Sequence, residues 1–323
     1  MKIAFFDAKS YDREFFSAAN EKFGDEIKFL DSHLHPDTAI LAKGYSVICA
    51  FVNDRIDAYM IEVLKSLGVE LIALRSAGYN NVDLKAAKGK IRVVRVPKYS
   101  PYAVAEHAVG MMFTLNRKLH RAYNRTRDNN FSIAGLLGFD MHGKTAGVIG
   151  IGQIGKVVVD ILKGLGMRVL TYDVQPNLSN STLEKLYEES DIITLHCPLT
   201  LDNKHLIDEK AFSKMKKGVM LINTGRGGLI DTKALIDNLK SQKVGAAGLD
   251  VYEEEGTYFY EDFSFSIMKD DVLARLLSFS NVLITSHQAF FTSEALHNIA
   301  HTTLENIREF TNNKPLKNEV FHV

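Results

Sequence analysis

Short β-rich runs alternate with helical patterns along almost the whole chain, and this alternation is the strongest constraint on its fold. In the first hundred residues the β-rich runs are IAFFDA, IKFLDS, SVICAF, ELIALRS and RVVRV, with helical patterns at 11–23, 36–43, 55–67 and 83–89 between them. Neighbouring parallel strands must be joined by a crossover, usually a helix. Strict alternation therefore predicts a parallel sheet covered by helices on both faces.

A second series of the same kind follows a long helix. Ser100 and Pro101 suit the N-cap and first position of this helix, whose apolar residues from Val104 to Leu119 share one face. After an Asn- and Gly-rich loop at 129–144, further strands are expected at TAGVIG, MRVLTYD, DIITLHCP, VMLINT, GAAGLDVY and NVLITS, with helices at 153–164, 182–190, 232–241 and 292–312. The chain of 323 residues is thus expected to be α/β, with two parallel-sheet units in tandem. The aromatic and acidic stretch 256–272 is interpreted as an ordered surface insertion.

The amino-acid composition excludes several classes of function. Lys plus Arg and Asp plus Glu both number 39, so the basic surface of a general nucleic-acid binder is missing and no nucleic-acid partner is expected. Cys49 and Cys197 lie in apolar runs, which favours free thiols in a reducing compartment. No segment has the length of apolar sequence that spans a membrane, and the N-terminus is too polar for a secretory signal, so a cytoplasmic protein is expected. His33 and His35 lack a third ligand nearby, so no metal site is predicted.

A glycine fingerprint in mid-chain predicts a dinucleotide site. Gly150, Gly152 and Gly155 stand in a GxGxxG spacing between the strand TAGVIG and the following helix. The first glycine permits a tight turn, the second lets the backbone approach a pyrophosphate, and the third lets the helix pack on the strand. Asp173 ends the next strand and can accept a hydrogen bond from the ribose 2′-hydroxyl, which favours NAD over NADP. The alternative, a glycine-rich turn that merely packs, requires three coincident signals to be accidental.

Three further strand ends bring together the residue types of a ketone/alcohol redox site. Arg226 lies on the loop Thr224–Gly228, acidic residues follow the next strand at Asp250 and 253–255, and His287 follows the last strand. The planar guanidinium of an arginine can hold a substrate carboxylate through two hydrogen bonds. A histidine can deliver a proton near neutral pH, and a carboxylate paired with it favours the imidazolium.

Each of these residues also has a plain structural interpretation. A loop arginine is often a surface ion-pair partner, a run of three glutamates is often a solvated face, and a lone histidine is often structural. The functional hypothesis rests on their joint occurrence after successive strands of one nucleotide-binding domain. Histidines without such a context are interpreted as structural or surface residues: His107, His120, His142, His196 and His205.

The chain resembles the D-isomer-specific 2-hydroxyacid dehydrogenases, and within that family it is most similar to the fermentative D-lactate dehydrogenases. Blocks that carry the resemblance are LRSAGYNNVDL at 74–84, YSPYAVAEHAVG at 99–110, GKTAGVIGIGQIG at 143–155, HCPLT at 196–200, GVMLINTGRGGLID at 218–231, GLDVYEEE at 248–255 and SHQAFFT at 286–292. The chain departs from the common family pattern at TGRGG and at Phe290-Phe291, where relatives often carry SRG and tyrosine.

The resemblance implies roles for individual residues. It implies that Arg226, Glu255 and His287 are catalytic, with Glu255 as the acid partner of the histidine. It implies cofactor contacts, beyond the three glycines and Asp173, from Gln153, Ile154, Cys197, Pro198, Asn203, Thr224, Gly225, Arg226 and Asp250. It implies that the substrate is lined by Ala77, Gly78, Tyr99 and Phe290 as well as by Arg226 and His287.

The resemblance also implies a domain arrangement and an assembly. The cofactor domain, a Rossmann domain at 99–290, would be inserted into a discontinuous substrate domain made of 1–98 plus 291–323, with crossings near Tyr99 and Phe290 acting as a hinge. Closure would exclude water from the bound NADH and 2-oxo acid. A homodimer or homotetramer is expected, with the 99–120 helix and the 129–142 loop as its interface.

These implications lead to a functional hypothesis with named alternatives. The expected activity is NAD-dependent reduction of pyruvate to D-lactate, with the histidine as proton donor. The alternatives are a 2-hydroxyacid dehydrogenase for larger 2-oxo acids, a glyoxylate reductase and, from another class, an NAD-sensing co-regulator.

Overall fold

The chain forms two compact units, each built around its own parallel sheet. A computed structural model describes residues 1–321. The first unit is Met1–Ser100 together with the chain from Phe290 onward, and the second is Pro101–Ala289. These boundaries fall within two residues of the predicted ones, 98/99 and 290/291. Within the described part of the chain, no helix combines the length and apolarity needed to cross a bilayer.

The first unit has a five-stranded sheet in the order β2-β1-β3-β4-β5, with every pair parallel. Its strands are β1 Lys2–Phe5, β2 Glu26–Phe29, β3 Val47–Ala50, β4 Leu71–Leu74 and β5 Arg92–Val94. Every residue of β3 and β4 is buried, which explains why these runs are continuously apolar and do not alternate. Successive residues of β1 point into different cores, Ile3 and Phe5 into one and Ala4 into the other.

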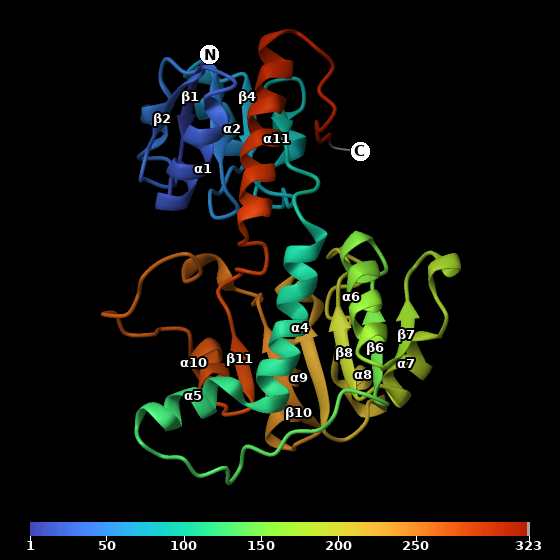
Figure 1. The fold of residues 1–323 in the computed structure, drawn as a ribbon. Helices are drawn as coiled ribbons and strands as arrows, with labels where there is room; N and C mark the ends of the chain where they lie inside the picture. The colour runs from blue at the N-terminus through green and yellow to red at the C-terminus, as the bar shows by residue number, and fades with distance from the viewer. Residues whose placement is uncertain (322–323) are drawn as a thin grey trace. The chain divides into compact units, whose positions relative to one another are not determined.

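Helices cover both faces of this sheet. One core contains residues of α2 (Ala58–Ser66), α3 (Leu84–Ala87) and the 3₁₀ turn η1 (Ala39–Ala42). The other contains residues of α1 (Ser10–Asn20) and of the last helix α11 (Ser293–Thr311). The C-terminal segment therefore completes a unit that begins at the N-terminus (Figure 1).

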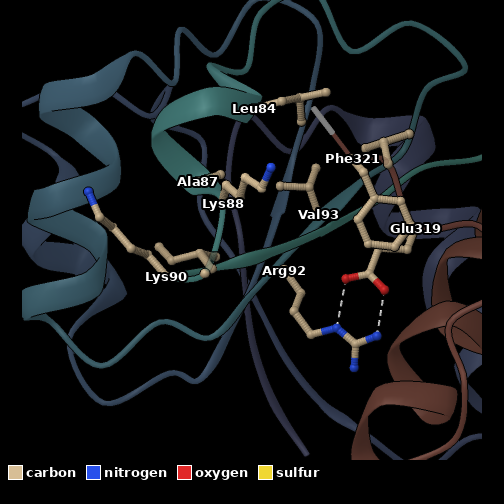
Figure 2. Close-up of a pocket in the computed structure, with 11 residues that line it drawn as sticks. Leu84, Ala87, Lys88, Lys90, Arg92, Val93, Glu319 and Phe321 are labelled. Carbon is tan, nitrogen blue, oxygen red and sulfur yellow. Dashed lines mark hydrogen bonds and ion pairs between the residues drawn. The ribbon is translucent and has the colours of Figure 1, made fainter. Parts of the chain in front are cut away.

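The C-terminal tail closes the outer strand of the first sheet. Glu319 forms an antiparallel bridge with Val94, and its carboxylate accepts from Nε and Nη2 of Arg92 at 2.8 and 2.5 Å (Figure 2). A pairing of this kind satisfies an edge that would otherwise be open. A hollow of about 300 Å³ lies between this tail, β5 and the end of α3, and none of the predicted site residues line it.

The second unit has a six-stranded parallel sheet in the order β11-β10-β9-β8-β6-β7 (Figure 1). Its strands are β6 Thr145–Ile149, β7 Arg168–Tyr172, β8 Ile192–Leu195, β9 Val219–Asn223, β10 Val244–Leu249 and β11 Val282–Ile284. The strand order reverses at β6, with β7 on one side and β8 on the other. Ligands of open parallel sheets bind outside the carboxyl ends of the strands at such a reversal.

Two cores sandwich this sheet as well. One contains α4 (Pro101–Arg117) and α6 (Gln153–Gly164), and the other contains α7 (Leu183–Glu189), α8 (Glu209–Lys214), α9 (Thr232–Lys240) and α10 (Asp271–Leu277). The remaining helix, α5 (Leu119–Arg127), has no buried residue. The predicted fold class, two parallel-sheet α/β domains, is thus confirmed.

Several elements differ from the prediction in detail. The long helix ends at Arg117, since the next residue, Lys118, adopts a left-handed φ of 52°, and a separate helix, α5, follows before the expected 129–144 loop. The predicted 36–43 helix is only the η1 turn. The 256–272 insertion has one 3₁₀ turn, η4 (Glu255–Thr257), and its last two residues already belong to α10.

Candidate active site

The three fingerprint glycines have three different surroundings at the junction of β6 and α6. Gly150 adopts φ 91°, a left-handed conformation that turns the chain tightly. A Cβ on Gly155 would lie 2.0 Å from the carbonyl oxygen of Gly150, so only glycine allows this approach. Gly152 is the N-cap of α6, and no described atom beyond its chain neighbours lies within 4 Å of a Cβ built on it. The space beside Gly152 at the start of the helix suits a pyrophosphate.

Asp173 closes the glycine turn from the end of β7. Its Oδ2 accepts from the backbone N–H of Ile151 at 2.7 Å, and its Oδ1 accepts from the N–H of Gln175 at 2.9 Å. The carboxylate is partly exposed and is fixed beside the helix N-terminus, with lone pairs left for a ribose hydroxyl. The residues present therefore fit an NAD molecule, with Gln153 and Ile154 in the first turn of α6.

The end of β8 lies against the same turn. A Cβ on Gly150 would meet the backbone nitrogen of Cys197 at 2.4 Å, so the backbone at Cys197 adjoins the predicted pyrophosphate site. Burial raises the pKa of the Cys197 thiol to about 11, which keeps it protonated and unreactive. Asn203 has a structural task, because its amide donates to the Pro198 carbonyl at 2.7 Å and accepts from the N–H of Thr200 at 2.7 Å.

Arg226 lies on a loop after β9 that a buried asparagine holds. Asn223 is 0% exposed, accepts from the N–H of Gly225 at 3.0 Å and donates to the carbonyl of Arg226 at 2.9 Å. A Cβ on Gly227 would lie 2.1 Å from the carbonyl carbon of Tyr252, so this loop packs directly on the segment after β10. Thr224 is buried and its hydroxyl has no hydrogen-bond partner in the described chain, so any cofactor contact from it would come from the backbone.

His287 and Glu255 form a close pair. Nδ1 of His287 lies 2.7 Å from Oε1 of Glu255, and the two side chains are 18% and 23% exposed. The other carboxylate oxygen of Glu255 accepts from the N–H of Tyr252 at 2.9 Å, which fixes the carboxylate on the segment after β10. Since Nδ1 is engaged, Nε2 is the ring nitrogen that can present a proton. Arg226, Glu255 and His287 thus follow three adjacent strands, β9, β10 and β11, at one sheet edge.

His287 has an unusual backbone that the sequence does not reveal. Its φ is 54°, in the left-handed region that costs a non-glycine residue about 1 kcal/mol or more. Its N–H donates to the Asp250 carbonyl at 2.7 Å, and its own carbonyl accepts from the Tyr260 hydroxyl at 3.1 Å. The insertion that follows Glu255 therefore contributes a hydrogen bond to the histidine.

Asp250 has a different environment from the one expected of a cofactor ligand. It is 0% exposed, Oδ1 accepts from the Thr285 hydroxyl at 2.5 Å and from the N–H of Gln288 at 2.9 Å, and Oδ2 accepts from the N–H of Ala289 at 2.9 Å. Both oxygens are thus engaged by the turn that carries His287. In this structure Asp250 organises that turn, and its predicted cofactor contact stays a prediction.

Two histidines that the sequence leaves without a partner have partners in the structure. Nε2 of His205 lies 2.7 Å from Oε1 of Glu253, and the Thr232 hydroxyl donates to the other oxygen of that glutamate at 3.3 Å. His107 contacts Thr285 and Asp250. His196 fits the structural interpretation, because burial lowers the pKa of its ring to about 4 and keeps it neutral. The carboxylate and hydroxyl partners of His205 and His107 are far away in sequence, so no spacing signal points to them.

The other predicted substrate residues belong to the first unit. The carbonyl of Ala77 accepts from Arg95 at 2.7 Å, and the carbonyl of Gly78 accepts from the Ser76 hydroxyl at 2.8 Å. The rings of Tyr99 and Phe290 meet edge to face, with centroids 6.2 Å apart. The segment after β4 and the two predicted crossing points are therefore ordered within that unit.

Comparisons with known proteins show which family the chain resembles in sequence and fold. Residues 109–289 match the family model described as the D-isomer specific 2-hydroxyacid dehydrogenase, NAD binding domain. A D-lactate dehydrogenase of Escherichia coli K12 is 52% identical over 99% of this chain and 100% of its own length, and a 2-hydroxyacid dehydrogenase homolog of Haemophilus influenzae is 52% identical over 99% of each chain. A solved structure of the pyruvate reductase of Chlamydomonas reinhardtii superposes with a TM-score of 0.93 at 46% identity and covers 98% of both chains.

Proposed function

The chain belongs to the D-isomer-specific 2-hydroxyacid dehydrogenase family, and on that premise we propose that it is an NAD-dependent D-lactate dehydrogenase that reduces pyruvate. The observation that carries the proposal is the pairing of His287 with Glu255 at 2.7 Å, at the same end of the parallel sheet as a glycine turn that fits the cofactor. Similarity to a D-lactate dehydrogenase at 52% identity and to a structure described as a pyruvate reductase favours a small 2-oxo acid as substrate.

In the proposed reaction His287 supplies the proton. Reduction of a ketone places negative charge on its oxygen, and a protonated Nε2 can neutralise that oxygen as the charge develops. The carboxylate of Glu255 stabilises the imidazolium before the transfer and keeps Nδ1 from competing for the substrate. General acid catalysis of this kind contributes about 10²–10⁴-fold to a rate.

Arg226 is proposed to hold the substrate. A guanidinium can donate two parallel hydrogen bonds to the carboxylate of a 2-oxo acid, which fixes the orientation of the keto carbon. The side chain is partly exposed and its backbone is held by Asn223, so the cation is presented from a fixed loop. Its loop follows β9, which pairs with β10, the strand that precedes Glu255.

The cofactor is proposed to be held by the β6–α6 turn and by Asp173. When bound, NADH supplies the hydride. The protein's part is to donate backbone N–H groups at the start of α6, to accept from the ribose at Asp173, and to pack Cys197-Pro198 against the turn. Ala77, Gly78, Tyr99 and Phe290 remain proposed substrate residues.

One kinetic experiment tests the proposal against its alternatives. NADH consumption is followed with pyruvate, with branched and aromatic 2-oxo acids, and with glyoxylate, and the kcat/KM values are compared. The proposal predicts the highest kcat/KM for pyruvate. A higher kcat/KM for a larger 2-oxo acid or for glyoxylate would identify that acid as the preferred substrate in place of pyruvate. Tight NADH binding without turnover would favour a cofactor sensor.

We also propose that the protein is a cytoplasmic homodimer or homotetramer. Large apolar side chains are exposed on α5 and the loop after it: Leu119, Tyr123, Phe131, Ile133 and Leu137, from 54% to 88%. Exposed apolar patches of this kind are typical of protein interfaces. Light scattering after size exclusion should show an oligomer that Ile133→Asp with Leu137→Asp shifts towards monomer, and a wild-type monomer would refute the assembly.

A further inference from the structure

A histidine on α4 reaches the turn that carries the proposed proton donor. Nε2 of His107 lies 3.1 Å from the hydroxyl oxygen of Thr285, the residue that directly follows β11. The same nitrogen lies 3.4 Å from Oδ1 of Asp250. The His107 side chain is 20% exposed and the Asp250 side chain is fully buried, so these contacts are largely shielded from water. Such shielding makes hydrogen bonds stronger and their loss more costly.

The number of hydrogens that each group can donate fixes the direction of these hydrogen bonds. Oδ1 of Asp250 lies 2.5 Å from the Thr285 hydroxyl, and a carboxylate can only accept. The single hydroxyl hydrogen of Thr285 is therefore donated to Asp250. The threonine oxygen must then accept from His107, so the hydrogen of the imidazole resides on Nε2. His107 thus donates a hydrogen bond to Thr285, and Thr285 donates one to Asp250.

Asp250, the last acceptor in this series of hydrogen bonds, holds the backbone of His287. The carboxylate of Asp250 accepts from the N–H groups of Gln288 and Ala289, and its carbonyl accepts from the N–H of His287. His287 adopts φ 54°, a conformation that persists only where the surroundings enforce it. Because Asp250 spans the residues on both sides of His287, a rotation of its carboxylate would release the turn that aims the ring.

We propose that His107 is a positioning residue for the reduction: by donating to Thr285 it keeps Asp250 oriented and so holds His287 in its left-handed turn. The inference rests on the proposed function, because it takes His287 to be the proton donor. His107 does not touch the Glu255 carboxylate, so it acts on the position of the ring and not on the ring's ion pair. The simpler view is that His107 only packs α4 against the sheet.

Variants at two positions separate these views. His107→Gln keeps an amide N–H that can donate to Thr285, whereas His107→Leu fills the space without a donor. Thr285→Ser keeps the hydroxyl and Thr285→Val removes it. Gly110→Ala is the matched control, since Gly110 is an exposed residue of the same helix and, its own helix backbone apart, no described atom lies within 4 Å of its Cβ position.

The measurements are kcat, the pyruvate KM, the pH profile of kcat/KM and the thermal midpoint of each variant. His107→Leu and Thr285→Val should lower kcat about 10- to 100-fold, as expected for a displaced catalytic group, and should alter the pH profile. The pyruvate KM should change much less, because Arg226 is untouched. His107→Gln and Thr285→Ser should recover most of kcat, and the double variant His107→Leu/Thr285→Val should be no slower than either single one.

The outcomes are distinguishable from a failure of the proposed function. An inactive wild-type protein would refute the function and the inference with it. An active wild type with an unchanged kcat and pH profile in His107→Leu would refute the inference alone. Equal losses in His107→Leu and His107→Gln that follow the thermal midpoint would show that His107 only packs. Should His107→Leu fail to fold, the Thr285→Val and Thr285→Ser pair decides by the same criteria.

Discussion

Replacing Gly152 with alanine should weaken cofactor binding strongly while leaving the fold intact. Apart from its chain neighbours, no residue that the structure describes has an atom within 4 Å of the added Cβ, and the backbone of Gly152, φ −71° and ψ −160°, is accessible to alanine. Alanine at the N-cap lowers the free energy of unfolding by about 1 kcal/mol, and the lower entropy of the unfolded chain offsets this by about 0.4–1 kcal/mol. The net change in stability should stay within about 1 kcal/mol, or about 2–4 °C in Tm.

The effect on cofactor affinity should be much larger. The methyl group would occupy the space through which the pyrophosphate approaches the backbone. Losing one hydrogen bond to a charged phosphate costs about 1.5–3 kcal/mol, which corresponds to a rise in the NADH Kd of about 10- to 100-fold. Titration by nicotinamide fluorescence measures this Kd directly, and the chain contains no tryptophan that would contribute emission.

Two other glycines of α6 serve as controls for this experiment. Gly164→Ala also adds a methyl group into open space, at the far end of the helix, and should leave the NADH Kd unchanged. Gly155→Ala would place a methyl group 2.0 Å from the Gly150 carbonyl oxygen and should destabilise the fold by about 1–3 kcal/mol or more. Wild-type NADH affinity in Gly152→Ala would refute the assignment of the turn as the pyrophosphate site.

Three further predictions concern the remaining site residues. Arg226→Lys should lower kcat/KM for pyruvate about 10- to 100-fold, because a point charge cannot replace a bidentate clamp, and near-normal kinetics would remove Arg226 from that role. Glu255→Gln should lower the pH at which reduction falls off, because the imidazolium loses its counter-charge, whereas Glu254→Gln should leave the profile unchanged. Equal pH profiles in both variants would show that another residue is the acid partner of His287. Asp173→Asn should raise the kcat/KM ratio of NADPH to NADH about 10-fold by removing repulsion of a 2′-phosphate, and an unchanged ratio would show that Asp173 does not face the ribose.

Features that depend on local sequence could be predicted well. The helix 153–164 has its predicted limits because a glycine turn determines where it begins and a second turn where it ends. Arg226, Glu255 and His287 could be placed at one sheet edge because parallel strands bring their carboxyl ends together. Both inferences need only the identity of a residue and its distance from a strand end.

Features that depend on distant contacts could not be predicted in the same way. His107 and Thr285 are 178 residues apart, and no periodicity relates them. Asp250 stands where a cofactor ligand is expected, yet its oxygens are engaged by N–H groups and a hydroxyl near His287, which only the folded turn brings to it. The left-handed backbone of His287 likewise follows from tertiary contacts, because histidine has no intrinsic preference strong enough to predict it.

In the proposed reaction the protein transfers hydride from NADH to pyruvate and forms the D-isomer of lactate. The most direct measurement uses NADH that carries deuterium at both C4 positions, followed by mass analysis of the product and a stereospecific lactate assay. The expected product is D-lactate with one deuterium at C2. L-lactate, or lactate without the label, would contradict it.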